Sequence, residues 1–134
     1  MLLALSGASP NFYQITLPNG LKVNAEIAKD KEKGLQGRKS LCSACGMIFI
    51  FDGEGYYGFW MKDTLINLAI LWINSDGRIV HIVKDAKPCV GKQDPYVECE
   101  VYSPFSPAKY VLEVSPNAVS GIEVGMKIRN KPFL

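Results

Sequence analysis

The residues best suited to chemistry lie together in one short segment, residues 56–64. Four aromatic residues fall within five positions there, and an amine, a carboxylate and a hydroxyl follow: Tyr56, Tyr57, Phe59 and Trp60, then Lys62, Asp63 and Thr64. An aromatic face gives a flat apolar platform, and directed polar groups beside it orient a small polar ligand, sugars included. We therefore expect a ligand site formed by these side chains: Tyr57, Trp60, Lys62, Asp63 and Thr64.

Arg38 is a candidate anion clamp for the same site, because a guanidinium group binds carboxylates and phosphates through two parallel hydrogen bonds. A structural interpretation of residues 56–64 is also open. In that interpretation Phe59 and Met61 pack into the core, and Lys62 pairs with Asp63 in water.

Four cysteines offer a second kind of chemistry. Cys42 and Cys45 form a C-x-x-C pair, and Cys89 and Cys99 lie ten positions apart. We expect two disulfides, Cys42–Cys45 and Cys89–Cys99, although the sequence alone allows three pairings. A zinc site of four thiolates is an alternative, but such sites usually combine two C-x-x-C pairs, and the second spacing here is too wide.

Redox catalysis and free buried thiols are the remaining alternatives for the cysteines. A thioredoxin-like pair begins a helix that follows a strand, where the helix dipole lowers a thiol pKa, whereas this C-x-x-C pair precedes an apolar, strand-like segment. Disulfides persist in oxidising compartments, so we expect an extracytoplasmic or cell-surface protein. Reduced cysteines in a source that is not a hyperthermophile would instead indicate the cytoplasm.

No familiar catalytic motif is present. His81, the single histidine, has no second ligand at a metal-binding spacing, and we expect it to be half-buried or on an edge strand. Glu98, Glu100 and Glu113 are candidate acid–base groups, but a solvated face explains them equally well. The sequence contains no P-loop, dinucleotide-binding or G-x-S-x-G motif. We expect no metal, no cofactor and no assigned catalytic residue.

The composition is that of a folded globular domain with little attraction for nucleic acid. The chain has 134 residues, of which 48% are hydrophobic and 21% charged, values that are typical of one domain. The net charge is +2, and the basic cluster between residues 29 and 39 is interrupted by Asp30 and Glu32. We therefore expect no nucleic-acid partner.

The first ten residues are briefly apolar and then small, without the basic start and longer apolar stretch of a secretory signal. We expect residues 1–10 to be a tail or the remnant of a trimmed signal, and residues 11–134 to form a single domain. No apolar stretch reaches the length of about 18 residues that a membrane span requires, so we expect no transmembrane segment.

Short apolar and alternating segments predict a protein made mostly of strands. We place these strands at residues 12–17, 21–27, 47–51, 65–73, 78–84, 110–114 and 124–129, with a short one near 97–101. Turn signals at residues 18–20 and 74–77 predict two hairpins. Residues 28–39, rich in lysine and glutamate and ending near Gly37, predict one short surface helix, and residues 116–120 a single helical turn. The expected fold class is mostly β (α+β): a small curled sheet or partly open β-barrel of about seven strands with one short surface helix.

Five segments resemble, in order, one known family: residues 34–38 (GLQGR), 46–51 (GMIFIF), 59–66 (FWMKDTLI), 108–114 (AKYVLEV) and 121–125 (GIEVG). Together they resemble the domain of unknown function 192 family over residues 21–128. The resemblance implies one small β-rich domain of bacteria and archaea, often exported, with no established activity. The chain departs from the family pattern at Asn67, Ala69 and Met126, where the family usually has proline, aspartate and aspartate.

These observations favour an exported or surface-exposed module that binds a small ligand, such as a carbohydrate, over Trp60 and its neighbours. One alternative is an enzyme that uses the same cleft, with Lys62 or Asp63 transferring a proton. The other is a structural or partner-binding protein, which would present a broad exposed apolar patch in place of a cleft.

Overall fold

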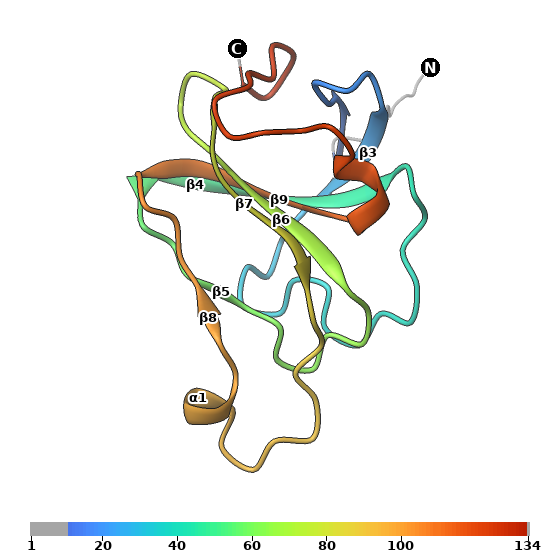
Figure 1. Ribbon diagram of the computed structural model, residues 1–134, viewed down its shortest axis with the longest axis vertical. Coiled ribbons are helices and arrows are strands. Elements are labelled where there is room, and N and C mark those ends of the chain that lie inside the picture. The colour runs from blue at the N-terminus through green and yellow to red at the C-terminus, as the bar shows by residue number, and fades with distance from the viewer. Residues whose placement is uncertain (1–10, 134) are drawn as a thin grey trace, which may run out of the picture.

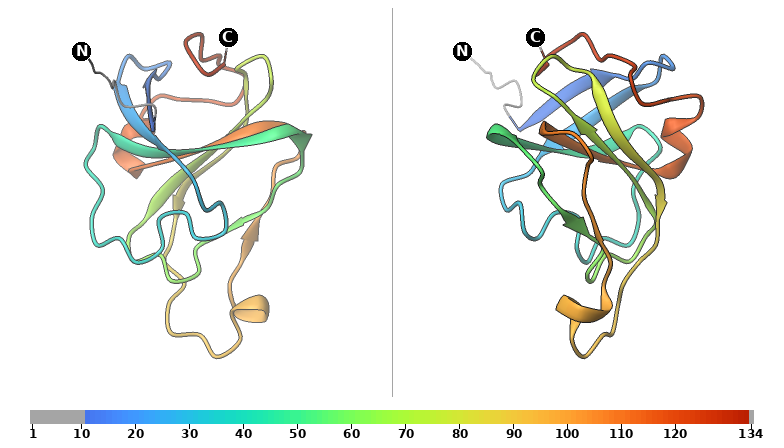
Figure 2. Two further views of the ribbon diagram at one scale, coloured as in Figure 1. Left: turned by 180° about the vertical axis from the view of Figure 1, so that it is seen from behind. Right: turned by 60° about the vertical axis from the view of Figure 1, so that its left-hand side comes forward.

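The computed structural model describes residues 11–133, and its main feature is a six-stranded mixed sheet (Figure 1). The expected tail, residues 1–10, lies outside the described residues. The strands, in spatial order, are β2 (Phe12–Thr16), β3 (Lys22–Ile27), β4 (Cys45–Gly55), β9 (Ala108–Val114), β6 (Leu68–Ile73) and β7 (Ile79–Ala86). Neighbouring strands are antiparallel except for the parallel pair β3 and β4. The sheet does not close into a barrel, which confirms the small curled sheet expected from the sequence (Figure 2).

Apolar side chains cover both faces of this sheet. All six residues of β6 are buried, as expected for a strand that is buried on both faces, and their side chains alternate between two apolar clusters. The first cluster joins one face to the β2–β3 hairpin, to the short 3₁₀ helix η1 (Pro116–Val119) and to the C-terminal segment. The second cluster lies on the other face and includes Leu35, Phe49, Met61 and Trp72. The candidate site lies on the side of the second cluster.

The expected helix at residues 28–39 is wrong: the segment is a series of turns. Gly34 and Gly37 adopt positive φ angles of 50° and 78°, which a right-handed helix does not contain. The Asp30 carboxylate accepts hydrogen bonds from the amides of Glu32 and Lys33, both at 3.1 Å, and so favours a turn over a helix at the start of the segment.

Two other segments also differ from the sequence-based expectation. The residues near 97–101 form the short helix α1 (Pro95–Glu98) and then β8 (Val101–Tyr102), which pairs with β5 (Phe59–Trp60). Residues 124–129 form no regular strand, but they run beside the start of β7: Arg78 and Lys127 form an isolated bridge, and Ile79 exchanges backbone hydrogen bonds with Gly125 and Met126. The helical turn at 116–120 is confirmed as η1. Within residues 11–133, no helix has the length and apolar character that crossing a membrane requires.

Candidate functional site

Residues 59–64 are held between two loops by backbone hydrogen bonds. The amide of Gly37 donates to the carbonyl of Asp63 at 2.9 Å, and the amide of Asp63 donates to the carbonyl of Cys89 at 2.9 Å. The amide of Cys89 in turn donates to the carbonyl of Met61 at 3.0 Å. The turns at residues 31–37 and the loop after β7 therefore fix the backbone that carries Lys62 and its neighbours.

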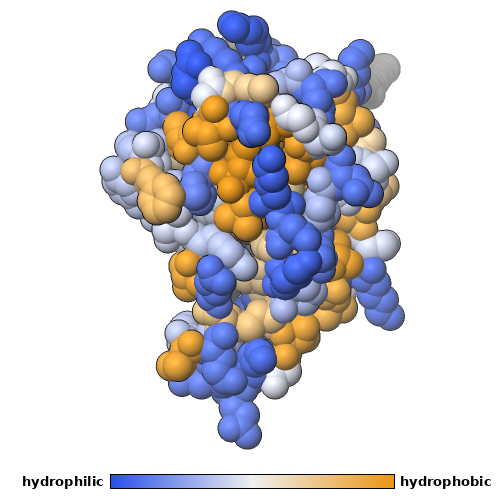
Figure 3. Space-filling model, viewed as in Figure 1, coloured by the Kyte–Doolittle hydropathy of each residue, from blue (hydrophilic) through white to orange (hydrophobic). Residues whose placement is uncertain are grey.

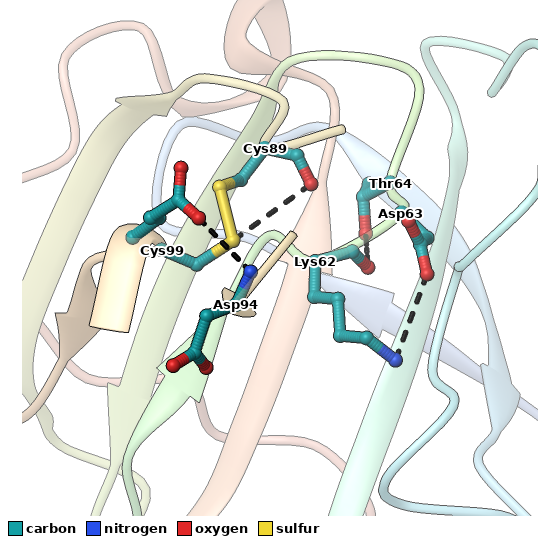
Figure 4. Close-up of a disulfide and its surroundings, with 7 residues drawn as sticks. Lys62, Asp63, Thr64, Cys89, Asp94 and Cys99 are labelled. Atoms are coloured by element: carbon teal, nitrogen blue, oxygen red, sulfur yellow. Dashed lines mark hydrogen bonds and ion pairs between the residues drawn. A yellow bond between two sulfur atoms is a disulfide. The ribbon is translucent and has the colours of Figure 1, made fainter. Parts of the chain in front are cut away.

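Both expected disulfides are present. Cys42 is bonded to Cys45 and Cys89 to Cys99, with Cα–Cα distances of 5.0 and 5.8 Å. Figure 4 shows the second disulfide beside the segment that carries Lys62. Bonded sulfurs cannot serve as zinc thiolates, and across residues 11–133 no three His, Cys, Asp or Glu side chains are grouped closely enough to hold a metal ion.

The Cys89–Cys99 disulfide closes the loop that carries α1 and brings Tyr96 to the segment 59–64. The ring centroids of Tyr96 and Trp60 lie 5.3 Å apart. The Nζ atom of Lys62 lies 5.8 Å from the centroid of the Trp60 ring. The same amine lies 3.6 Å from the Asp63 carboxylate (Figure 4). Tyr96, Trp60 and Lys62 thus form one connected cluster.

This cluster borders a pocket of about 680 Å³ between residues 57–64 and the turns at residues 30–36. Its lining includes four of the six residues proposed for the site from sequence: Tyr57, Trp60, Lys62 and Thr64. The lining also contains residues that were not proposed for the site, among them Gly34, Phe49, Phe51, Tyr96 and Glu113. The volume falls within the range of about 300–1,000 Å³ that is usual for small-molecule sites.

Contacts behind the pocket surface fix the aromatic wall. Tyr57 stacks on Phe51 with a centroid distance of 3.7 Å, and Phe59 meets Phe49 edge to face at 4.8 Å. The indole nitrogen of Trp72, which is fully buried, donates to the carbonyl of Tyr57 at 2.9 Å. Because each ring has a packing partner, the wall is formed in the absence of any ligand.

Glu113 is the one buried acid in this pocket. It lies on β9 opposite Met47 of β4 and Ile70 of β6, and only 4% of its surface is exposed. No described residue gives its carboxyl group a hydrogen bond or an ion pair, and the side chain faces the pocket. Burial raises the pKa of this carboxyl to about 8, because a low-dielectric environment disfavours the charged form.

The expectation of a solvated face for the three glutamates is therefore wrong for Glu113, although Glu98 and Glu100 are exposed. The residues on either side of Glu113, Leu112 and Val114, face the first apolar cluster, so Glu113 faces the second. A sequence signal for this existed: Glu113 is the one charged residue in the otherwise apolar run of residues 110–114, and such a run is typical of a strand that is covered on both faces.

Arg38 and Asp63 lie outside the lining of the pocket. Arg38 binds Glu26 through two hydrogen bonds of 2.9 and 3.1 Å and borders a second hollow, of about 650 Å³, on the other side of the turns. This bidentate contact lowers the pKa of Glu26 and raises the pKa of Arg38. The Asp63 side chain is 53% exposed, and its structural contribution comes from the two backbone hydrogen bonds described above.

The comparison with family models identifies the chain. Residues 15–130 match the model of DUF192, described as an uncharacterized ACR. The chain belongs to the DUF192 family. This result confirms the resemblance seen in the sequence, and the match contains every pocket-lining residue.

Two solved structures resemble this DUF192 chain in fold and in sequence. One is a proposed transcription regulator from Sinorhizobium meliloti 1021, with a TM-score of 0.73, 25% identity, and coverage of 91% of this chain and 97% of the other. The second is a protein of unknown function from Novosphingobium aromaticivorans DSM 12444, with a TM-score of 0.73, 26% identity, and coverage of 87% and 82%. No curated protein matches the chain.

The three departures from the DUF192 pattern do not alter the pocket. The side-chain amide of Asn67 donates to Asp85 at 2.9 Å, Ala69 is fully buried in the first apolar cluster, and Met126 lies at the surface. None of the three lines the pocket. A site built around Glu113 and the aromatic wall is therefore independent of the positions at which this chain differs.

His81 has a structural environment away from the pocket. It lies on the edge strand β7, and its ring sits between Trp72 and Phe105 at centroid distances of 5.3 and 5.0 Å. Partial burial lowers the pKa of His81. Its position on an edge strand agrees with the sequence-based expectation.

Proposed function

We propose that this DUF192 chain is a small-ligand binding module and that its site is the pocket of about 680 Å³ between residues 57–64 and 30–36. The observation that carries the proposal is the combination of a pre-formed aromatic wall with an unpaired acid, Glu113, facing the same space. A concave apolar site with a few polar groups is the usual form of a small-molecule site. A carbohydrate remains a candidate because Trp60 and Tyr96 provide flat faces at the rim.

We further propose that the protein works in an oxidising compartment outside the cytoplasm. Two disulfides support this, because such bonds persist where glutathione and thioredoxin do not reduce them. One solved relative is described as a transcription regulator, which would suggest nucleic-acid binding. This role has weaker support in the present chain. The net charge of +2 gives little electrostatic attraction to phosphate backbones.

A thermal-shift panel of sugars, amines and small peptides, followed by calorimetry on any hit, tests the binding proposal. We expect at least one compound to stabilise the protein, and we expect Trp60→Ala to weaken its binding about tenfold or more. Tyr56→Ala is the matched control, because Tyr56 is an exposed aromatic residue that does not line the pocket. Equal binding by the Trp60→Ala variant and the parent would place the ligand elsewhere and end the proposal.

An enzymatic role in the same pocket is the second candidate, and one observation favours it. A buried carboxyl group with a pKa of about 8 is suited to proton transfer near neutral pH. Glu113 would then be the proton-transfer group in place of Lys62 or Asp63. Turnover of a bound compound that is lost in Glu113→Gln while binding persists would favour the enzyme over the binding module.

A structural or partner-binding role has less support. Figure 3 shows apolar side chains gathered over β7 on one face, and hydrophilic side chains cross them. An interaction surface is normally a larger continuous apolar patch. The pocket is a more specific feature than this apolar surface, and the proposed experiments therefore address the pocket.

A further inference from the structure

We propose, on the basis of the binding function above, that the ligand carries a positively charged nitrogen, which pairs with the carboxyl group of Glu113 while aromatic rings surround its substituents. The ligand class is therefore an organic ammonium compound. The proposal depends on three features of the pocket: a carboxyl group without a partner, lysines none of which pairs with that carboxyl group, and aromatic rings beside it.

The first step concerns the carboxyl group. Glu113 lies among apolar side chains of the second cluster, between Met47 and Ile70, and no described residue pairs with it. Leaving a buried acid without a partner costs free energy, and folded proteins keep such groups mainly at sites where they act. No described side chain supplies the partner, so the carboxyl group is left to bind what fills the pocket, water or a ligand.

The second step concerns the cations that already border the pocket. The amine of Lys62 lies 3.6 Å from the Asp63 carboxylate and 5.8 Å from the centroid of the Trp60 ring. The amine of Lys31 lies 5.6 Å from the centroid of the Phe51 ring. These two lysines interact at the rim, and Lys33, the third lysine of the lining, makes no ion pair with Glu113 either. The positions of Lys31 and Lys62 also show that the Phe51 and Trp60 rings present their faces to ammonium groups.

The third step places an aromatic ring next to the carboxyl group. A single point, the position of a β-carbon built on Gly34, lies 3.7 Å from Oε1 of Glu113 and 3.1 Å from Cζ of Phe49. The carboxyl oxygen and the Phe49 ring therefore approach the same point beside Gly34, so an ammonium group bound there would have an aromatic neighbour. Aromatic rings around a carboxylate are a common way to bind an organic cation, because the ring faces attract the charge without requiring hydrogen bonds.

The remaining charges around the pocket nearly balance. The turns and residue 62 contribute two acids and three amines: Asp30 and Glu32, with Lys31, Lys33 and Lys62. The four charged residues on the turns are exposed and screened by solvent, whereas Glu113 is not.

Because burial holds the pKa of Glu113 near 8, the acid is mostly protonated in neutral solution. Binding of an ammonium group stabilises the carboxylate, so binding releases the carboxyl proton to the buffer.

Benzylamine and benzyl alcohol form a matched pair of probes, because they share a ring and differ in the ammonium group. Calorimetry near pH 7, in two buffers with different ionisation enthalpies, measures both affinity and proton release. We expect benzylamine to bind at least about tenfold more tightly than benzyl alcohol and to release a proton. In Glu113→Gln the two affinities should become equal, whereas the control Glu123→Gln, at an exposed position outside the pocket, should behave as the parent.

A second measurement on the parent protein removes any dependence on folding of the variant. Carbon-13 NMR of the glutamate carboxyl groups follows the Glu113 titration directly, and we expect benzylamine, but not benzyl alcohol, to lower that pKa. Equal affinities of the two probes for the parent overturn the ammonium proposal but leave the binding function standing. If neither probe binds, the ammonium proposal is overturned, and the panel with Trp60→Ala decides the binding function separately.

Discussion

Gly34 lies over the carboxyl group of Glu113: a β-carbon at position 34 would stand 3.7 Å from its Oε1 atom, an ordinary contact distance. The same β-carbon would lie 3.1 Å from Cζ of Phe49, closer than an ordinary carbon–carbon contact. Gly34 also has a φ of +50°, in the left-handed region that glycine adopts without steric penalty. A side chain at position 34 would therefore strain the backbone and press against the Phe49 ring on β4, whereas glycine does neither.

Alanine substitutions at Gly34 and Gly37 separate the effect of backbone strain on the free energy of unfolding from the effect of steric contact. Gly34 and Gly37 both have positive φ, but a β-carbon on Gly37 would have no neighbour within 4 Å. We expect Gly37→Ala to lower the free energy of unfolding by about 1 kcal/mol through strain alone. Gly34→Ala should cost about 1–3 kcal/mol more, because it also pushes against the Phe49 ring. Urea unfolding of both variants measures the difference, and equal losses would show that the contact with Phe49 is not constraining.

The unfolding free energy should depend on pH through Glu113. Its pKa rises from an ordinary value of 4.5 to about 8 on folding, so the folded state binds the proton more tightly than the unfolded state. This contribution to stability is complete below about pH 4.5 and is lost as the pH rises toward 8. The loss has an upper limit of about 5 kcal/mol.

Denaturant unfolding of the parent and of Glu113→Gln at several pH values between 4.5 and 8 tests this dependence. Glutamine cannot lose the proton, so the variant should lack the decline. Burial lowers the pKa of His81, so this residue acts in the opposite direction, but it is present in both proteins and its effect cancels in the comparison. Parallel pH profiles for the two proteins would contradict the assignment of a raised pKa to Glu113.

The strands were predictable because apolar alternation reports directly on a covered sheet face. Strand β3 follows this pattern, whereas β6 and β9 were predictable from nearly unbroken apolar runs, because both of their faces are covered. The failure at residues 28–39 has a clear physical cause. Helix-favouring lysines and glutamates occupy the surface there, but two glycines with positive φ and the buried Leu35 shape the segment to the sheet below. Such an approach depends on tertiary contacts that a local pattern does not contain.

The candidate site was predictable at its rim but not at its base. Tyr57, Trp60, Lys62 and Thr64 are close in sequence and line one pocket. Glu113 comes from a strand far along the chain and reaches the pocket through the sheet order β4-β9-β6. No spacing rule joins position 113 to positions 57–64, because the link is the pairing of strands, which the sequence pattern did not specify.

Arg38 is expected to contribute to local stability and not to ligand binding in the aromatic pocket. Its guanidinium is held by Glu26, and the two side chains are 42% and 34% exposed, so the pair should contribute about 0.2–1 kcal/mol. Arg38→Gln should therefore lower the unfolding free energy slightly and leave the affinity of any pocket ligand unchanged. Glu26→Gln should have the same small effect, and a marked loss of affinity in Arg38→Gln would restore the anion clamp expected from the sequence.

The two disulfides should differ in their effect on the pocket, although both stabilise the fold. In the chain-entropy model, loss of the Cys89–Cys99 bond costs about 3 kcal/mol and loss of the shorter Cys42–Cys45 bond about 2 kcal/mol. Only the Cys89–Cys99 disulfide closes the loop that carries α1. This loop holds the Tyr96 ring 5.3 Å from the Trp60 ring. The disulfide also lies beside the hydrogen bonds from Asp63 to Cys89 and from Cys89 to Met61, so its removal loosens the backbone at Lys62.

The double variant Cys89→Ser with Cys99→Ser should therefore lose stability and also bind a pocket ligand less tightly, because the rim is no longer held in place before binding. The double variant Cys42→Ser with Cys45→Ser is the matched control: it should lose stability and keep the affinity, since neither residue lines the pocket. Calorimetry below the unfolding transition of each variant separates the two effects. Equal affinities in both double variants would mean that Tyr96 needs no tether, and that the contact with Trp60 alone holds it at the rim.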